Sequence, residues 1–182
     1  MRKSFITITG LLAATLLFGT SGASASPEDV YYDQVAEADA TVLSAQPTTN
    51  FGADDILQTG RGMRSYFRVE VSGQVTRIVL KLFPLRDGAG SKLYLASPGW
   101  AESTITWATR PDLGTFLGKT GGVSMGQAVE MDLTSALCGP PPVLFCSPGT
   151  LDFALTSAGG VTQYASTEHW LMAGPRLVLY VI

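Results

Sequence analysis

Short segments in which apolar and polar residues alternate, separated by closely spaced turn residues, are the feature that most constrains the fold of this chain. Phe67, Val69 and Val71 share one face of the segment RSYFRVEV, and the same period of two recurs in residues 128–134 and 150–156. This period is typical of antiparallel strands that turn one face to a core and the other to solvent.

The remaining segments extend the same pattern along the chain. Residues 76–85, TRIVLKLFPL, are apolar on both faces and indicate a central strand, whereas Gly-rich and Pro-rich turns lie between the segments. No sustained helical period interrupts them. We therefore expect residues 38–182 to form one all-β domain, an antiparallel two-sheet β-sandwich with a jelly-roll-like arrangement.

The N-terminus has the pattern of a secretory signal peptide. Two basic residues precede an apolar stretch over 5–18, and the small residues Ala-Ser-Ala follow at 23–25. We expect residues 1–25 to be removed and the protein to be secreted and extracellular. A membrane anchor is disfavoured because the stretch is shorter than the ~20 residues that span a bilayer. Residues 26–37 are interpreted as a polar lead-in.

The charge balance argues against two classes of partner. The chain has 12 basic and 15 acidic residues, and removal of residues 1–25, which carry two of the basic ones, changes the net charge from −3 to −5. Nucleic-acid binding usually needs a basic surface, so a nucleic-acid partner is not expected. No lysine-rich run indicates a membrane surface, and no membrane insertion is expected after cleavage.

The two cysteines, Cys138 and Cys146, lie in the segment CGPPPVLFC. An even, closely spaced pair in an exported protein predicts one disulfide. The alternative is a redox or metal pair. The spacing does not match a redox motif, and His169, the one histidine of the sequence, leaves too few ligands for zinc.

Two of the three tryptophans lie in the segment WAESTITWATRP, residues 100–111. If residues 103–109 form a strand, Ile105 and Trp107 share a face, which we expect to face the core. Trp100 precedes that strand and has the opposite parity, so we expect a peripheral position. Burial of Trp100 under a loop and contact of its ring with a ligand both stay open.

The same segment resembles the tryptophan, glutamate and TITW stretch of DNRLRE domains, which overlap carbohydrate-binding module family 96. Other stretches resemble the family in the same order: ADATV at 38–42, TTNFG at 48–52, VEMDLTSAL at 129–137 and YASTE at 164–168. The resemblance covers nearly the whole mature chain, the part after residue 25. It implies a jelly-roll sandwich with a non-catalytic role in binding polysaccharide or building cell-surface assemblies.

Acidic residues in these matched stretches are candidate metal ligands. Calcium prefers carboxylate and carbonyl oxygens, and jelly-roll binding modules often hold such an ion near a strand end. By this analogy we expect a structural Ca²⁺. The alternative is that each carboxylate caps a turn or pairs with a surface arginine. The candidate ligands are Asp39, Glu102, Asp132 and Glu168.

Carbohydrate recognition needs flat aromatic faces for the apolar side of a sugar and planar polar groups for its hydroxyls. Arginine also suits the carboxylate of a uronic acid through paired hydrogen bonds. The alternative is an ordinary solvated sheet face. The candidate ligand-binding residues are Trp100, Tyr66, Arg64, Arg68 and Tyr164, with Tyr94 and Trp170 as further aromatic candidates.

No catalytic constellation stands out in the sequence. A Gly-x-Ser-x-Gly elbow is absent, and His169 lies in a context, TEHW, that is typical of a surface loop. Together with the resemblance to carbohydrate-binding module family 96, this leads us to expect a secreted, non-catalytic polysaccharide-binding module and not an enzyme. The alternative function is a structural or adhesive extracellular protein that uses the same sandwich for protein contacts.

Overall fold

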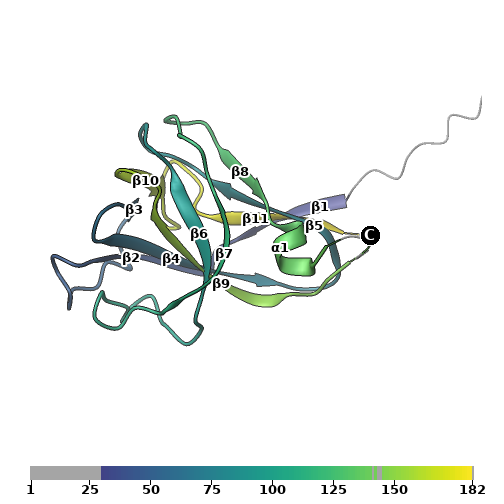
Figure 1. Cartoon of the computed structure of the whole chain (residues 1–182), viewed down its shortest axis with the longest axis horizontal. Helices are drawn as coiled ribbons and strands as arrows, with labels where there is room; N and C mark the ends of the chain where they lie inside the picture. Colours follow the sequence, from purple (N-terminus) through teal and green to yellow (C-terminus); the bar gives the residue numbers. More distant parts are fainter. Residues whose placement is uncertain (1–29, 141, 143–144, 182) are drawn as a thin grey trace, which may run out of the picture.

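The computed structural model describes residues 30–140, 142 and 145–181, and within them eleven strands and one short helix build the fold (Figure 1). The elements are β1 Val30–Val35, β2 Ala38–Leu43, β3 Ile56–Thr59, β4 Met63–Val71, β5 Val75–Leu82, β6 Ser91–Ala96, β7 Leu113–Lys119, β8 Val129–Asp132, α1 Thr134–Cys138, β9 Gly149–Ser157, β10 Thr162–Ala165 and β11 Arg176–Val181.

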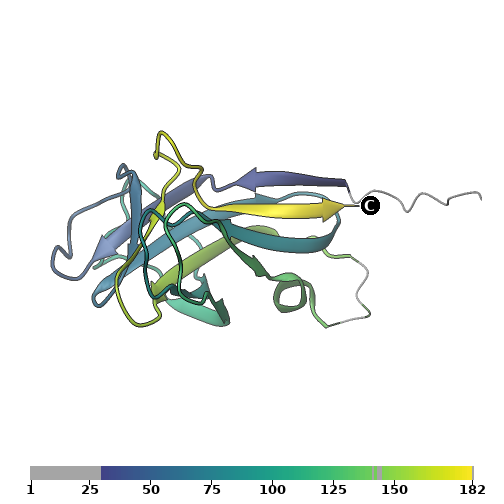
Figure 2. The same ribbon diagram turned by 90° about the horizontal axis from the view of Figure 1, so that it is seen from above.

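The strands form two main antiparallel sheets. One has the order β1-β11-β5-β8 and the other the order β2-β4-β9-β6-β7, and β10 pairs with β3 in a small two-stranded sheet. Figures 1 and 2 show the two sheets as packed layers, with α1 near the C-terminal end of β11. The predicted all-β antiparallel sandwich is confirmed. Its jelly-roll connectivity stays a prediction.

The core lies between the two sheets and follows the alternation of the sequence. Phe67, Val69 and Val71 of β4 enter it from the five-stranded sheet, and Phe67 stacks on Phe153 of β9 with ring centroids 4.8 Å apart. The four-stranded sheet contributes β5, which lies between β11 and β8 as its two-faced apolar pattern predicted. Period-two patterning therefore determined which face of each of these strands is buried.

The predicted boundary at residue 38 is wrong. Val30–Val35, which the sequence analysis placed in a lead-in, forms β1 and pairs along its length with β11, from Val30 opposite Val181 to Val35 opposite Arg176. This edge strand exposes most of its side chains and is held by backbone pairing, so its sequence carries little apolar signal. The signal peptide at 1–25 lies outside the described residues. Among the described helices, none is long and apolar enough to cross a membrane.

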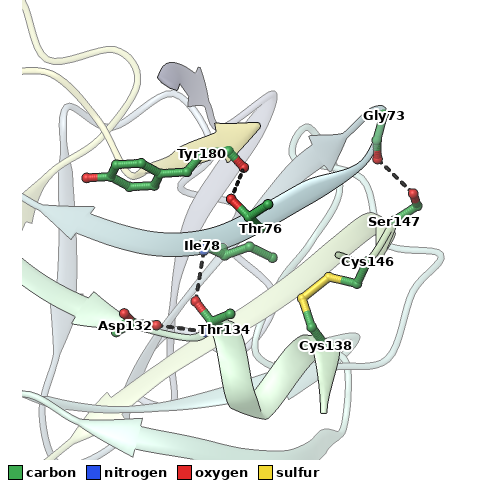
Figure 3. The surroundings of a disulfide bond; sticks show 9 residues. All are labelled: Gly73, Thr76, Ile78, Asp132, Thr134, Cys138, Cys146, Ser147 and Tyr180. Carbon is green, nitrogen blue, oxygen red and sulfur yellow. Dashed lines mark hydrogen bonds between the residues drawn. A yellow bond between two sulfur atoms is a disulfide. The ribbon is translucent and has the colours of Figure 1, made fainter. Parts of the chain in front are cut away.

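The predicted disulfide between Cys138 and Cys146 is confirmed, with a Cα–Cα distance of 5.3 Å. It joins the end of α1 to the segment that leads into β9 (Figure 3). Thr134, at the start of α1, accepts a hydrogen bond from the backbone N–H of Ile78 at 3.0 Å. The disulfide and this hydrogen bond together fasten α1 to the end of the sandwich.

Candidate functional site

Residues 97–112, which connect β6 to β7, cross the outward face of the five-stranded sheet, and we call this segment the strap. It appears as the teal-green loop at the end of the molecule opposite α1 (Figure 1). A second apolar cluster lies beneath it, made of Ala40, Val42, Tyr66, Trp100, Ile105 and Ala154. The outward face, where a solvated surface was expected, is therefore largely covered.

The expected strand over residues 103–109 is wrong, because this part of the strap consists of turns. The backbone N–H of Ile105 donates to the Ala101 carbonyl, and the Thr106 and Thr109 hydroxyls bond to each other and to each other's backbone N–H. Threonine hydroxyls thus accept hydrogen bonds from backbone N–H groups that, in a strand, would donate to a neighbouring strand. Without the strand, the expected burial of the two tryptophans is reversed. Trp100, expected at the periphery, is 7 % exposed, whereas Trp107, expected to face the core, is half-buried.

The two tryptophans of the strap lie against two arginines of β4. The guanidinium of Arg68 is 4.9 Å from the Trp100 ring centroid, and that of Arg64 is 5.5 Å from the Trp107 ring centroid. Arg64 and Arg68 are four residues apart and share the outward face of the strand, about 13 Å from each other along it. The seven-residue spacing of the tryptophans therefore lets each ring contact one of these arginines, and the two cation–π contacts hold the strap on the sheet.

Two predicted stacking residues cannot bind a ligand through their rings, because both are completely buried. Tyr66 lies under the strap, where its hydroxyl donates to the Pro111 carbonyl at 3.0 Å. Tyr164 lies in the main core, and its hydroxyl donates to Ser91 Oγ at 3.1 Å. Burial raises the pKa of both phenols. The expectation of exposed rings fails because the strap covers Tyr66 and because Tyr164 packs into the main core.

A polar groove of about 470 Å³ opens at the edge of the strap, and Arg68 and Trp100 form part of its wall. Asp152 of β9 accepts hydrogen bonds from Trp100 Nε1 at 2.6 Å and from Arg68 Nε at 2.8 Å. These bonds fix a carboxylate, a guanidinium and an indole in one arrangement without a ligand. The remaining lining residues are Glu37, Pro98, Gly99 and Thr150.

The charges of the groove do not favour an anion. The guanidinium of Arg68 is already paired with Asp152, and Glu37 adds a second carboxylate on the exposed rim. One cation and two anions leave a net negative lining. Such a groove is suited to accept hydrogen bonds from sugar hydroxyls, because carboxylate oxygens are strong acceptors.

Three acidic residues converge beside the groove and form what we call the acidic cluster. One carboxylate oxygen each of Asp39, Glu102 and Glu168 lies within 4.8 Å of the others. The Asp39 N–H donates to Glu102 Oε1 at 2.7 Å, and the Thr167 N–H donates to Asp39 Oδ2 at 2.8 Å. Asp39 is 1 % exposed, and its Oδ1 has no hydrogen-bond partner among the described residues.

The environment of Asp39 disfavours its charged form. Burial raises the pKa of this carboxyl from 3.8 to about 7, the Thr167 backbone hydrogen bond opposes the rise, and the charges of Glu168 and Glu102 add to it. A bound cation would reverse this balance, since it is the largest local charge in such a site. The donors are all oxygens, which suits a hard cation and not zinc.

Asp132, the fourth predicted metal ligand, does not join the cluster, and that part of the prediction is wrong. It lies at the end of β8 in the other sheet, where it pairs with Arg77 Nε at 2.8 Å and accepts the Thr134 N–H (Figure 3). All four acidic residues lie in stretches of the sequence that resemble the family. The order of such stretches along the chain does not show which of their residues lie side by side in the fold.

Asp152 and Glu37 were missed in the sequence, although both line the groove. Asp152 lies directly opposite Arg68 in the pairing of β4 with β9. The alternation of residues 150–156 put Asp152 on the outward face, which was correct. Its partner became identifiable only once the register of the two strands was known.

The family model of carbohydrate-binding module family 96 matches residues 30–178, from the first residue of β1 into β11. No curated protein matches the chain. The matched region contains the strap, the groove and all three members of the acidic cluster.

Proposed function

The chain belongs to carbohydrate-binding module family 96, and from this membership we propose that it is a secreted, non-catalytic module that binds polysaccharide in the groove beside Trp100. The signal-peptide pattern of residues 1–25 supports secretion, and the disulfide agrees with an oxidising compartment. The family assignment supports binding without catalysis.

The observation that carries the proposal is the fixed set of planar polar groups in the groove. Asp152 is held by Arg68 and Trp100, so its orientation does not have to be ordered when a ligand binds. Its second oxygen, the Glu37 carboxylate and the Thr150 hydroxyl are available for sugar hydroxyls. Preorganised groups of this kind lower the entropic cost of binding.

The groove favours a neutral polysaccharide over a polyuronate. A uronate carboxylate would approach two carboxylates, Glu37 and Asp152, and an arginine that already has a partner. Two arginines without an ion-pair partner in the described part of the chain, Arg64 of β4 and Arg110 of the strap, both contact the Trp107 ring. A uronic-acid preference would therefore point to the Trp107 side and not to the groove.

The experiment is an affinity panel with hydroxyethylcellulose, galactomannan and alginate, each at low and high salt. We expect retention by a neutral polymer with little salt dependence, because uncharged hydroxyls are not screened. The combined Glu37→Ala and Thr150→Ala changes should abolish retention, since both exposed residues line the groove. Glu130→Ala is the matched control, an exposed acidic residue of β8 in the other sheet.

Three outcomes would contradict parts of this proposal. Full retention in the groove variant would place the site elsewhere. Salt-sensitive binding of alginate that Arg64→Gln removes would move the site to the Trp107 side. Absence of binding to every polymer would favour the structural or adhesive function instead.

The acidic cluster is proposed as a Ca²⁺ site of this module. Ca²⁺ binds oxygens at about 2.3–2.6 Å, so ligand oxygens around one ion lie up to about 5 Å apart. The mutual separations of the three carboxylate oxygens, all within 4.8 Å, agree with this range. Asp39, Glu102 and Glu168 would hold the ion, whose positive charge would stabilise three carboxylates in close contact.

A further inference from the structure

The acidic cluster joins three segments that are distant in the sequence. Asp39 belongs to β2, Glu102 to the strap, and Glu168 to the connection between β10 and β11. Two of these segments also form the groove: Glu37 lies two residues before Asp39, and Trp100 lies two residues before Glu102. The cluster and the groove therefore use the same two stretches of the chain, residues 37–39 and residues 100–102.

Close contacts hold the strap where it carries Glu102. Asn50 donates two side-chain hydrogen bonds, to the carbonyls of Glu102 at 2.6 Å and Ile105 at 2.8 Å. Gly52 packs so closely that a Cβ atom there would lie 2.3 Å from the Glu102 carbonyl oxygen. These contacts hold residues 102–105 of the strap, and Trp100 in the wall of the groove lies only two residues before Glu102.

The three carboxylates lack a compensating charge. None of the ion pairs among the described residues includes Asp39, Glu102 or Glu168. Asp39, which belongs to this cluster, is 1 % exposed, and its buried Oδ1 has no hydrogen-bond partner among the described residues. Like charges at this separation repel, and the repulsion acts between β2 and the strap.

We infer that a divalent cation held by Asp39, Glu102 and Glu168 fastens the strap to β2 and thereby increases the affinity of the adjoining groove for polysaccharide. This inference rests on the proposed function of the groove. Coupling of this kind is reciprocal, so polysaccharide also tightens the binding of the cation. The all-oxygen ligand set indicates Ca²⁺ as the cation.

The test measures the affinity of the mature chain for the three polymers named above, in 1 mM Ca²⁺ and in EDTA. We expect at least about five-fold weaker binding in EDTA, the lower end of typical coupling between sites. Glu168→Gln should bind the polymer with the affinity of the EDTA sample and should not respond to Ca²⁺. Glu168 is exposed and does not line the groove, so this variant leaves the groove lining unchanged. Glu130→Gln is the matched control and should keep the Ca²⁺ response.

A second readout does not depend on polysaccharide. Amide hydrogen exchange of residues 100–105 should slow when Ca²⁺ is added to the wild type and should not change in Glu168→Gln. Equal polysaccharide affinity in both buffers, with slower exchange in Ca²⁺, would mean a purely structural ion and would overturn the coupling. No Ca²⁺ effect on exchange would overturn the cation site. Slower exchange in Ca²⁺ without polymer retention in either buffer would overturn the proposed function, and the coupling with it, while the cation site would stand.

Discussion

Arg68 holds Trp100 by both its ring and its backbone. The guanidinium lies 4.9 Å from the ring centroid, and its NH2 group donates to the Trp100 carbonyl oxygen at 3.0 Å. Asp152 completes the arrangement by accepting hydrogen bonds from both residues. One side chain of β4 thus fixes the point where the strap meets the groove, and the first prediction concerns its loss.

Arg68→Met should destabilise the protein by about 3 kcal/mol, because it leaves the largely buried Asp152 without its cation. Arg64→Met is the matched control on the same face of β4. It should cost less than 1 kcal/mol, since Arg64 forms no ion pair among the described residues and contacts the half-buried Trp107. Urea unfolding measures both. Equal destabilisation by the two changes would contradict the role given to Arg68.

Trp100→Ala should cost about 3–5 kcal/mol, as large aromatic truncations do, because the ring is buried and its Nε1 donates to Asp152. Trp107→Ala should cost clearly less, since this ring is only half-buried. The expected order is the reverse of the one that strand parity suggests. Denaturant melts of the two variants decide it, and a larger loss for Trp107→Ala would show that the strap packs differently.

Removal of divalent cations should lower the melting temperature, and Ca²⁺ should restore it, because a ligand that binds only the native state stabilises it. Asp39→Asn should abolish the Ca²⁺ increment. In EDTA at neutral pH the same variant should melt at or above the wild type, since it removes a buried charge that lacks a counter-charge. Differential scanning calorimetry with and without EDTA measures these shifts. An unchanged Ca²⁺ increment in Asp39→Asn would exclude this residue as a ligand.

Replacement of both Cys138 and Cys146 by serine should cost about 2.5 kcal/mol, the loop-closure entropy expected for so short a loop. Mass spectrometry of the non-reduced secreted protein should find two fewer hydrogens than the thiol form has. Alkylation of both cysteines without prior reduction would contradict the pairing. Neither cysteine lines the groove, so its ligand affinity should be unaffected.

A substitution at Trp170 distinguishes binding in the groove from binding on this exposed tryptophan, which is an alternative stacking site. Its ring is 81 % exposed, so Trp170→Ser should change stability by no more than about 0.5 kcal/mol. If the groove is the binding site, this variant keeps its polysaccharide affinity. Affinity electrophoresis beside the Glu37 and Thr150 variant tests this, and loss of binding in Trp170→Ser alone would transfer the site to the exposed tryptophan.

The sequence by itself determined the properties that depend on neighbouring residues. Alternation at period two placed Phe67, Val69 and Phe153 in the core, because successive side chains of a strand point to opposite faces whatever the rest of the chain does. The short spacing of Cys138 and Cys146 was likewise sufficient to predict their pairing. β1 escaped prediction because an edge strand is held mainly by backbone pairing, which leaves little apolar pattern.

Only the tertiary structure decided the burial and the partners of the outward-facing residues. Parity showed that Tyr66 and Arg68 point away from the core, but the strap decides whether that side is open to solvent, and it buries Tyr66. The acidic cluster and the contact of Arg68 with Asp152 join residues 63 or more positions apart. Such contacts depend on strand register and on the path of a turn-rich loop, and a local pattern contains neither.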